Sequence, residues 1–323
     1  MEILFGLFLG KPLWMWLTFM GLVAVLLVLD LGVFHRESRA IGVSESLVLS
    51  AVYISLGVAF GGWIWWTLGA EAGMNYLTGF AIEKALAMDN VFVIAMIFTF
   101  FAVPQAYQHR VLFWGIVGVI ILRAIMIGLG AALIASFDWV LYLFALFLVA
   151  TGVKMLIMGD SEYDVASNPV LRIVRKRFNV TDELHGEKFF VRLPTAAGKT
   201  ATFMTPLFLA LVLVEFADVI FAVDSVPAIF AITTDPFIVY TSNIFAILGL
   251  RALYFALAAM VHRFHYLKVA LAFVLIFIGS KIFAADLLGI EKVPPLLSLG
   301  VTFSILISGV LFSLWKTRDE QKA

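Results

Sequence analysis

The sequence contains no cysteine and only five histidines in 323 residues. The lack of cysteine excludes disulfides, thiolate metal sites and cysteine nucleophiles. None of the histidines lies deep in an apolar run, so a histidine-lined metal site within such a run is not expected. Charged residues are also scarce, at 14%, whereas a soluble domain holds about a quarter. The net charge is zero, which gives no basis for a nucleic-acid partner. No nucleophile or cofactor motif is present, so the sequence does not predict an enzyme.

Apolar residues take the place of the missing charge. They make up 63% of the chain, and the mean hydropathy is +1.05. A membrane-spanning helix needs about 20 mostly apolar residues. We therefore predict an all-α membrane protein that forms a single transmembrane domain over residues 1–323. The nine predicted transmembrane helices are 12–34, 44–68, 75–101, 110–135, 138–158, 202–232, 237–261, 267–288 and 294–315.

Lysine and arginine are distributed unevenly between the predicted loops. With the N-terminus outside, the inner loops and the C-terminal tail hold 15 of them and the outer side holds 2. Because positive residues favour the cytoplasmic side, this predicts an outside N-terminus and an inside C-terminus. Residues 159–200 then form a cytoplasmic loop. Within it, Asn168 and Pro169 precede apolar residues at helical spacing, which fits a short amphipathic helix on the inner leaflet or a charged linker.

Two parts of the chain repeat one another in order. Aligning Asp89 with Asp224 also aligns Glu83 with Asp218, and two further matches follow at nearly fixed spacing. These are Leu122-Arg123-Ala124 with Leu250-Arg251-Ala252, and Gly152-Val153-Lys154 with Gly279-Ser280-Lys281. Each copy holds three predicted spans, 75–158 and 202–288, and an odd number inverts the second copy relative to the first. Such inverted repeats are typical of secondary transporters, whose site lies near the bilayer midplane.

Five acidic residues lie inside the third and sixth predicted spans. They are Glu83, Asp89, Glu215, Asp218 and Asp224. A charge at the bilayer centre costs roughly 2.5–3.5 kcal/mol, so five unpaired acids would cost about 12–17 kcal/mol. That exceeds the total stability of many proteins, so protons, basic residues or a metal ion must neutralise them. Arg123 and Arg251 are the expected deep counter-charges, and internal ion pairing alone is the simpler alternative.

The side chains near these acids indicate which ion they would bind. Carboxylates, the Asn90 amide and the Ser225 hydroxyl are hard oxygen ligands, which suit Mn²⁺, Ca²⁺ or Mg²⁺. Asn243 in the seventh span is a weaker candidate, because asparagine in a span more often bonds a neighbouring helix. We therefore predict a divalent-cation site in the membrane. The ion is a transported substrate, and no cofactor is expected.

The spacing of the acids adds a geometric expectation. Glu83 and Asp89 lie about 120° apart on a straight helix, so both face one ion only if the helix is broken. Pro227 follows Asp224 by three residues and would free a backbone carbonyl. We therefore expect discontinuous third and sixth spans, with released carbonyls joining the site.

The acid-bearing segments resemble those of the TerC/Alx family of bacterial inner-membrane proteins, most closely the Alx branch. The segments that carry the resemblance are Glu83 to Val93, Val214 to Phe230, Thr233 to Phe237 and Thr241 to Ala252. The resemblance covers about residues 12–315. It implies a multi-pass protein of the inner membrane that exports manganese from the cytoplasm, with some members linked to tellurium resistance or pH response. Some relatives are thought to load metal onto exported proteins.

The residues and the resemblance together predict a secondary exporter of Mn²⁺, with proton antiport as one mechanism. A Ca²⁺ transporter remains an alternative, because the ligands do not separate the two ions. A non-transporting membrane partner, acting in stress or metal loading, is the alternative of another class. The expected partners are a divalent cation and membrane lipid. Association with a second copy or with metal-requiring exported proteins stays open.

Overall fold

The computed structural model describes residues 2–29, 42–157, 165–194, 200–258, 267–290 and 293–320. This part of the chain is mostly helical, with two short antiparallel hairpins. The helices are α1 (Glu2–Phe5), α2 (Leu13–Leu29), α3 (Val43–Leu68), α4 (Ala70–Phe100), α5 (Gln105–Ser136), α6 (Trp139–Ile157), α7 (Pro169–Arg177), α8 (Pro206–Phe230), α9 (Pro236–Leu248), α10 (Leu250–Ala258), α11 (Leu267–Leu287) and α12 (Pro295–Glu320). The strands are β1 (Leu7–Phe8), β2 (Lys11–Pro12), β3 (Phe190–Pro194) and β4 (Thr200–Met204).

Six helices in the described ranges are long and apolar enough to cross a membrane. They are α3, α5, α6, α8, α11 and the Pro295–Thr317 part of α12. Two further apolar helices, α2 and α9, are shorter. Helix α4 has 31 residues, and Glu83, Lys84 and Asp89 lie along it. These charged residues set α4 apart from the six.

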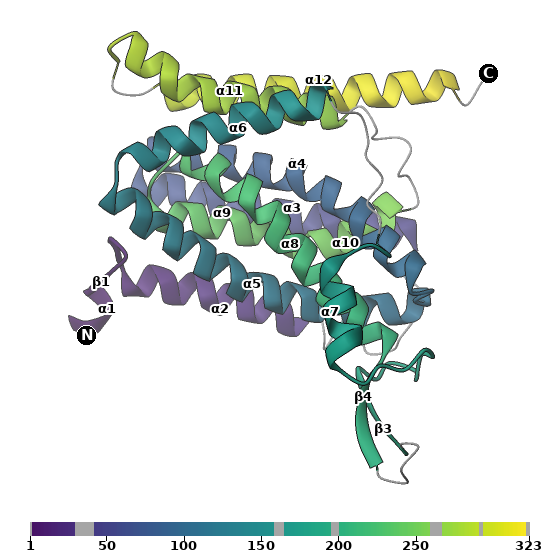
Figure 1. Cartoon of the computed structure of the whole chain (residues 1–323). Helices are drawn as coiled ribbons and strands as arrows, with labels where there is room; N and C mark the ends of the chain where they lie inside the picture. The colour runs from purple at the N-terminus through teal and green to yellow at the C-terminus, as the bar shows by residue number, and fades with distance from the viewer. Residues whose placement is uncertain are drawn as a thin grey trace.

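The long helices lie side by side and run across the view in Figure 1, with α6, α11 and α12 at the top and α2 and α5 at the bottom. Helix α4 packs against α3, α8 and α9, and α5 packs against α8. Half of the most apolar stretch of α8 is buried, against 17% of that of α12. Helix α8, which carries three of the five predicted acids, is therefore central, whereas α12 is peripheral.

Two glycines bring α6 and α11 into close contact. A Cβ atom at Gly152 would lie 2.7 Å from the Ala272 carbonyl oxygen, and one at Gly279 would lie 2.5 Å from the Ala145 carbonyl oxygen. No larger residue fits at either point without moving backbone, because real side chains do not approach that closely. The pair therefore packs through two matching small-residue contacts.

The expectation that the third and sixth spans are broken is wrong. Helix α4 is continuous from Ala70 to Phe100, and α8 is continuous from Pro206 to Phe230 with Pro227 inside it. Pro227 lies three residues before the end of α8, and its missing N–H removes the bond to the Val223 carbonyl without ending the helix there. The break falls instead in the seventh predicted span, where Gly249 separates α9 from α10.

The segment between the two copies contains one predicted element and one that was not predicted. The short helix after Asn168 is confirmed as α7, and the Asn168 side chain caps it by accepting a hydrogen bond from the Val170 N–H at 2.9 Å. Leu171 of α7 is buried inside the protein and does not face lipid. Strands β3 and β4 form a hairpin, so α8 begins at Pro206 and not at 202.

Candidate functional site

Arg123 is the centre of a buried polar cluster in which three helices meet. It lies on α5 with 0% of its side chain exposed. Its Nη1 lies 3.0 Å from Glu83 Oε1 on α4. Its Nε and Nη2 each lie 3.3 Å from an oxygen of Asp218 on α8, which is a two-pronged contact. Its Nη1 also donates to Ser225 Oγ at 2.5 Å. The predicted counter-charge therefore contacts three of the predicted ligands directly.

Helical spacing on α8 explains which side chains reach Arg123. Asp218 and Ser225 are seven residues apart, so they differ by only about 20° around the helix axis. Asp224 is six residues from Asp218 and points about 120° away. It meets α6 instead, where Thr151 Oγ1 donates to Asp224 Oδ1 at 3.4 Å. Asp224 therefore does not join Asp218 at Arg123 in this structure, because α8 stays helical between them.

The carboxylates around Arg123 have more hydrogen-bond acceptor atoms than the guanidinium binds. Glu83 is 1% exposed, and its Oε2 atom is buried without a hydrogen-bond partner. With both carboxylates ionised, Glu83 and Asp218 together exceed the charge of Arg123 by one. An unpaired buried charge is costly, so the cluster is electrostatically suited to an added cation or proton.

A small cavity lies beside Asp218. Its volume is about 40 Å³, and α4, α5, α8, α9 and α10 contribute its lining. The polar side chains in this lining are Asn90 and Asp218. A cavity holds a water molecule once it offers roughly 10–15 Å³, so this one has room for a water-sized species next to the Asp218 carboxylate. Asn90, another predicted ligand, is thus brought to the same space as Asp218.

Glu215 lies one helical turn from Asp218 on α8, and its carboxylate rests against Gly118 of α5. A Cβ atom at Gly118 would overlap the Glu215 carboxylate oxygens. Glu215 Oε2 is buried and has no hydrogen-bond partner. Glycine at 118 therefore makes room for the Glu215 carboxylate against the helix that carries Arg123.

Asn243 is fully buried, and neither its Nδ2 nor its Oδ1 atom has a partner. The neighbours of Asn243 on α9 indicate its direction. Ser242 lies beside Gly79 of α4, and the Tyr240 hydroxyl donates to the Ile120 carbonyl of α5 at 3.1 Å. At 100° per residue, Asn243 falls between these two directions and faces the gap between α4 and α5. Glu83 and Arg123 extend into that same gap from either side. Asn243, the weaker candidate in the sequence, is therefore a stronger candidate ligand in the structure.

Lys84 stabilises the helix break between α9 and α10. Its Nζ donates to the Ala246 carbonyl at 3.0 Å, in the last turn of α9. A cation at this position is favourable, because the carbonyls at a helix C-terminus carry partial negative charge. A Cβ atom at Gly249 would lie 2.6 Å from Lys84 Nζ, so glycine there makes room for the ammonium. Ile247 and Leu250, on either side of the break, line the cavity beside Asp218.

The sequence analysis missed Lys84, Gly118 and Gly249. One signal was present: Gly249 precedes the Leu-Arg-Ala of the second copy, whereas Ile121 precedes that of the first. A glycine present in only one copy indicates a helix break in that copy alone. The side chains of two other predicted residues, Asp89 and Arg251, lie outside the described part of the structure.

The described residues do not form a ready metal-binding group of three or more acidic, histidine or cysteine side chains. Arg123 itself lies between Glu83 and Asp218. An ion that used both carboxylates would therefore compete with this guanidinium for the same oxygens.

The described residues are mostly helical, with six candidate spans and a buried acidic cluster, and define a multi-pass integral membrane protein. The profile of the integral membrane protein TerC family matches residues 68–321, and the chain belongs to that family. It is 48% identical over 299 residues to a protein of Rickettsia bellii described as an uncharacterized membrane protein, covering 93% of this chain and 96% of that one. It is 45% identical over 309 residues to a membrane protein of Myxococcus xanthus, covering 96% and 94%. It is also 45% identical over 315 residues to an Escherichia coli K12 protein described as "Putative membrane-bound redox modulator Alx", covering 95% of each chain. No solved structure matches.

Proposed function

We propose that this protein is a secondary transporter that exports Mn²⁺ from the cytoplasm across the bacterial inner membrane. The observation that carries the proposal is the Arg123 cluster, where two buried carboxylates share one guanidinium and Glu83 Oε2 has no partner. Hard oxygen ligands suit Mn²⁺, Ca²⁺ and Mg²⁺ alike. The choice of Mn²⁺ rests on the family to which the chain belongs.

Arg123 acts in this proposal as a built-in replacement for the ion. It neutralises Glu83 and Asp218 while no metal is present, and it releases their oxygens when a divalent cation arrives. Charge balance then requires a third carboxylate. Glu83, Asp218 and Glu215 together offset one guanidinium and one divalent ion, and the sum is zero. Glu215, unpaired and one turn away, supplies that charge.

The remaining oxygen ligands come from neighbouring neutral groups. Asn243 Oδ1, Asn90 Oδ1 and Ser225 Oγ are the nearest candidates on α9, α4 and α8. Ser225 Oγ already accepts a hydrogen bond from Arg123. Asn243 is the best placed of the three, because both of its amide atoms are buried and unpartnered.

We also propose nine spans and two inverted repeats, with the N-terminus outside and the C-terminus inside. The α6–α11 contact supports this arrangement. Gly152 meets Ala272 while its counterpart Gly279 meets Ala145, the counterpart of Ala272. The same reciprocity relates α4 on α9 to α5 on α8. Such exchanged contacts are what a two-fold axis between inverted copies produces.

Two alternative functions use the same cluster. A Ca²⁺ transporter would use the same oxygens. A non-transporting membrane partner is favoured by one observation, namely that Arg123 already pairs with two acids. The name of the Escherichia coli relative suggests a redox role for that protein. A thiol-based role of that kind has no residue here, since the chain has no cysteine.

Flux measurements in proteoliposomes test the proposal. Reconstituted protein should accumulate Mn²⁺, and parallel assays with Ca²⁺ and Mg²⁺, each with and without a pH gradient, identify the ion and any proton coupling. Glu83→Gln and Asp218→Asn should each abolish flux. Asp138→Asn, the same kind of change at an exposed position between α5 and α6, is the matched control. Flux no higher than in empty liposomes for all three ions would favour the non-transporting partner.

A further inference from the structure

Residues 7–12 form a compact hairpin whose turn exposes a leucine. Strands β1 and β2 pair antiparallel, Leu7 with Pro12 and Phe8 with Lys11. The turn residues Leu9 and Gly10 have φ of 48° and 78°. Two-residue turns of this kind favour asparagine or glycine at both positions. Here the tip residue is a leucine that is 50% exposed.

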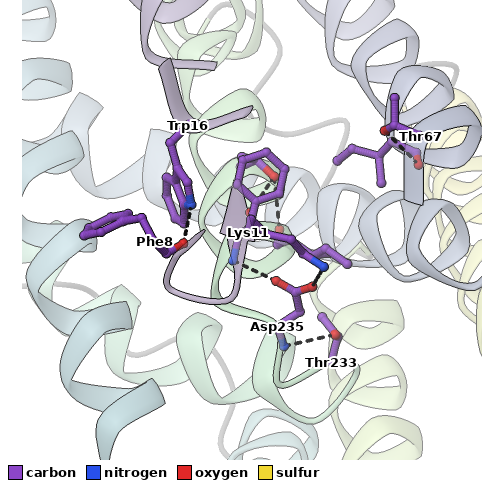
Figure 2. Close-up of polar contacts among 10 residues, drawn as sticks. Phe8, Lys11, Trp16, Thr67, Thr233 and Asp235 are labelled. Carbon is purple, nitrogen blue, oxygen red and sulfur yellow. Dashed lines mark hydrogen bonds and ion pairs between the residues drawn. The ribbon is translucent and has the colours of Figure 1, made fainter. Parts of the chain in front are cut away.

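Two polar contacts fasten the hairpin to the helices (Figure 2). The Trp16 indole N–H donates to the Phe8 carbonyl at 2.9 Å. Lys11 Nζ lies 2.8 Å from Asp235 Oδ2. The other Asp235 oxygen accepts from the Phe237 N–H at 3.0 Å and so caps α9. The hairpin is thereby held at the N-terminus of α9, next to the turn after α8.

The hairpin and the short helix α1 (Glu2–Phe5) before it expose apolar side chains. Phe5 is 68% exposed and Leu7 is 76% exposed, and Leu4, Phe8 and Leu9 are exposed as well. Residues 3–10 contain no charged residue, and Lys11 pairs with Asp235. This surface continues onto α2, where Leu17 and Met20 are exposed. Because α2 is an apolar helix of a membrane protein, its exposed side faces lipid. The hairpin lies at the N-terminal end of α2 and continues this apolar surface.

We propose that residues 4–12 are an interfacial anchor that inserts Phe5, Leu7 and Leu9 into the adjacent leaflet of the protein's own bilayer. In the proposed orientation this is the outer leaflet. The Lys11–Asp235 pair connects this anchor to the N-terminus of α9, so the membrane surface fixes the end of a helix that carries Asn243. Apolar and aromatic side chains at the headgroup boundary are the usual means of such anchoring.

The absence of cysteine allows a direct test with the full chain in liposomes. Single cysteines introduced as Leu7→Cys and Leu9→Cys are labelled with a nitroxide, and its accessibility to oxygen and to a water-soluble nickel chelate is measured. Met20→Cys on α2 is the lipid-facing control, and Thr202→Cys on β4 is the water-facing control. Both hairpin labels should give a ratio of oxygen to nickel accessibility several-fold above that of Thr202 and below that of Met20, which lies deeper along α2.

Two outcomes would overturn the anchor. Nickel accessibility at Leu7 and Leu9 equal to that at Thr202 would place the hairpin in water. Spin–spin broadening at Leu9 that disappears on dilution with unlabelled protein would show that a second copy covers this face. The measurement needs no transport, so repeating it in Asp218→Asn separates failure of the anchor from failure of the proposed function.

The ion pair is tested by label mobility at position 9. Lys11→Gln should increase the mobility, and Asp235→Asn should increase it equally, because asparagine still caps α9 while the charge is lost. The double variant should add nothing to either single change. Unchanged mobility in Lys11→Gln would show that the pair does not hold the hairpin.

Discussion

Removing Arg123 tests whether its charge or its packing supports the fold. In Arg123→Met, Glu83 and Asp218 lose the guanidinium that lies 3.0 and 3.3 Å from their oxygens. Breaking a buried ion pair by removing one partner typically destabilises a protein by about 3–5 kcal/mol, because the other charge stays buried and unpaired. Two stranded carboxylates place Arg123→Met at the upper end of that range.

Neutralising the stranded acids should reverse the loss. The triple variant Arg123→Met, Glu83→Gln and Asp218→Asn contains no buried charge at this point. Replacement of a whole buried ionic group by neutral residues of similar volume is often close to neutral. The triple variant should therefore recover most of the stability while its Mn²⁺ flux stays abolished. This separates a structural effect of Arg123 from loss of the ion path.

The assay is reversible unfolding in mixed micelles, combined with flux in proteoliposomes. Arg110→Met is the control, since Arg110 is 42% exposed and contacts Glu187 at 3.5 Å, so the change should cost less than about 1 kcal/mol. Mn²⁺ at a hundredfold excess over its dissociation constant should stabilise the wild type by about 2.7 kcal/mol and leave the triple variant unchanged. An Arg123→Met variant as stable as the wild type, or a triple variant no better than it, would refute the counter-charge argument.

Three other predictions follow from the geometry of the site. Gly118→Ala places a methyl group where the Glu215 carboxylate lies, so its flux should fall as far as that of Glu215→Gln; normal flux would mean that Glu215 is not needed. Lys84→Met and Gly249→Ala disturb the same contact, so the double variant should be no less stable than the worse single variant to within about 0.5 kcal/mol, and a fully additive loss measured by unfolding would show independent roles. Asp224→Asn should reduce Mn²⁺ flux less than Asp218→Asn, because Asp224 meets α6 and not Arg123; an equal loss would put both acids on one path.

Several parts of the molecule were predictable because they depend on local pattern. The apolar runs predicted the helices, and Asn168 followed by Pro169 predicted the start of α7. The cost of burying charge in lipid required Arg123 to pair with acids, and it contacts Glu83 and Asp218. These conclusions need only hydropathy, capping chemistry and charge, all of which can be read along the chain.

Other features depend on which helices meet, and only the folded chain shows that. Whether Asp224 joins Asp218 was decided by the continuity of α8, which turns the two acids about 120° apart. The break at Gly249 depends on Lys84, which reaches the end of α9 at Ala246, 162 positions further along the chain. The space that the Glu215 carboxylate fills is likewise made by a glycine on another helix, Gly118 of α5.

Composition and spacing alone therefore determined a helical membrane protein with buried acids and an arginine to balance them. Tertiary structure decided which acids contact that arginine and where the helix break between α9 and α10 falls. The physical reason is that burial energy depends on residue type, whereas a shared ion pair depends on angles and distances between helices that are remote in sequence.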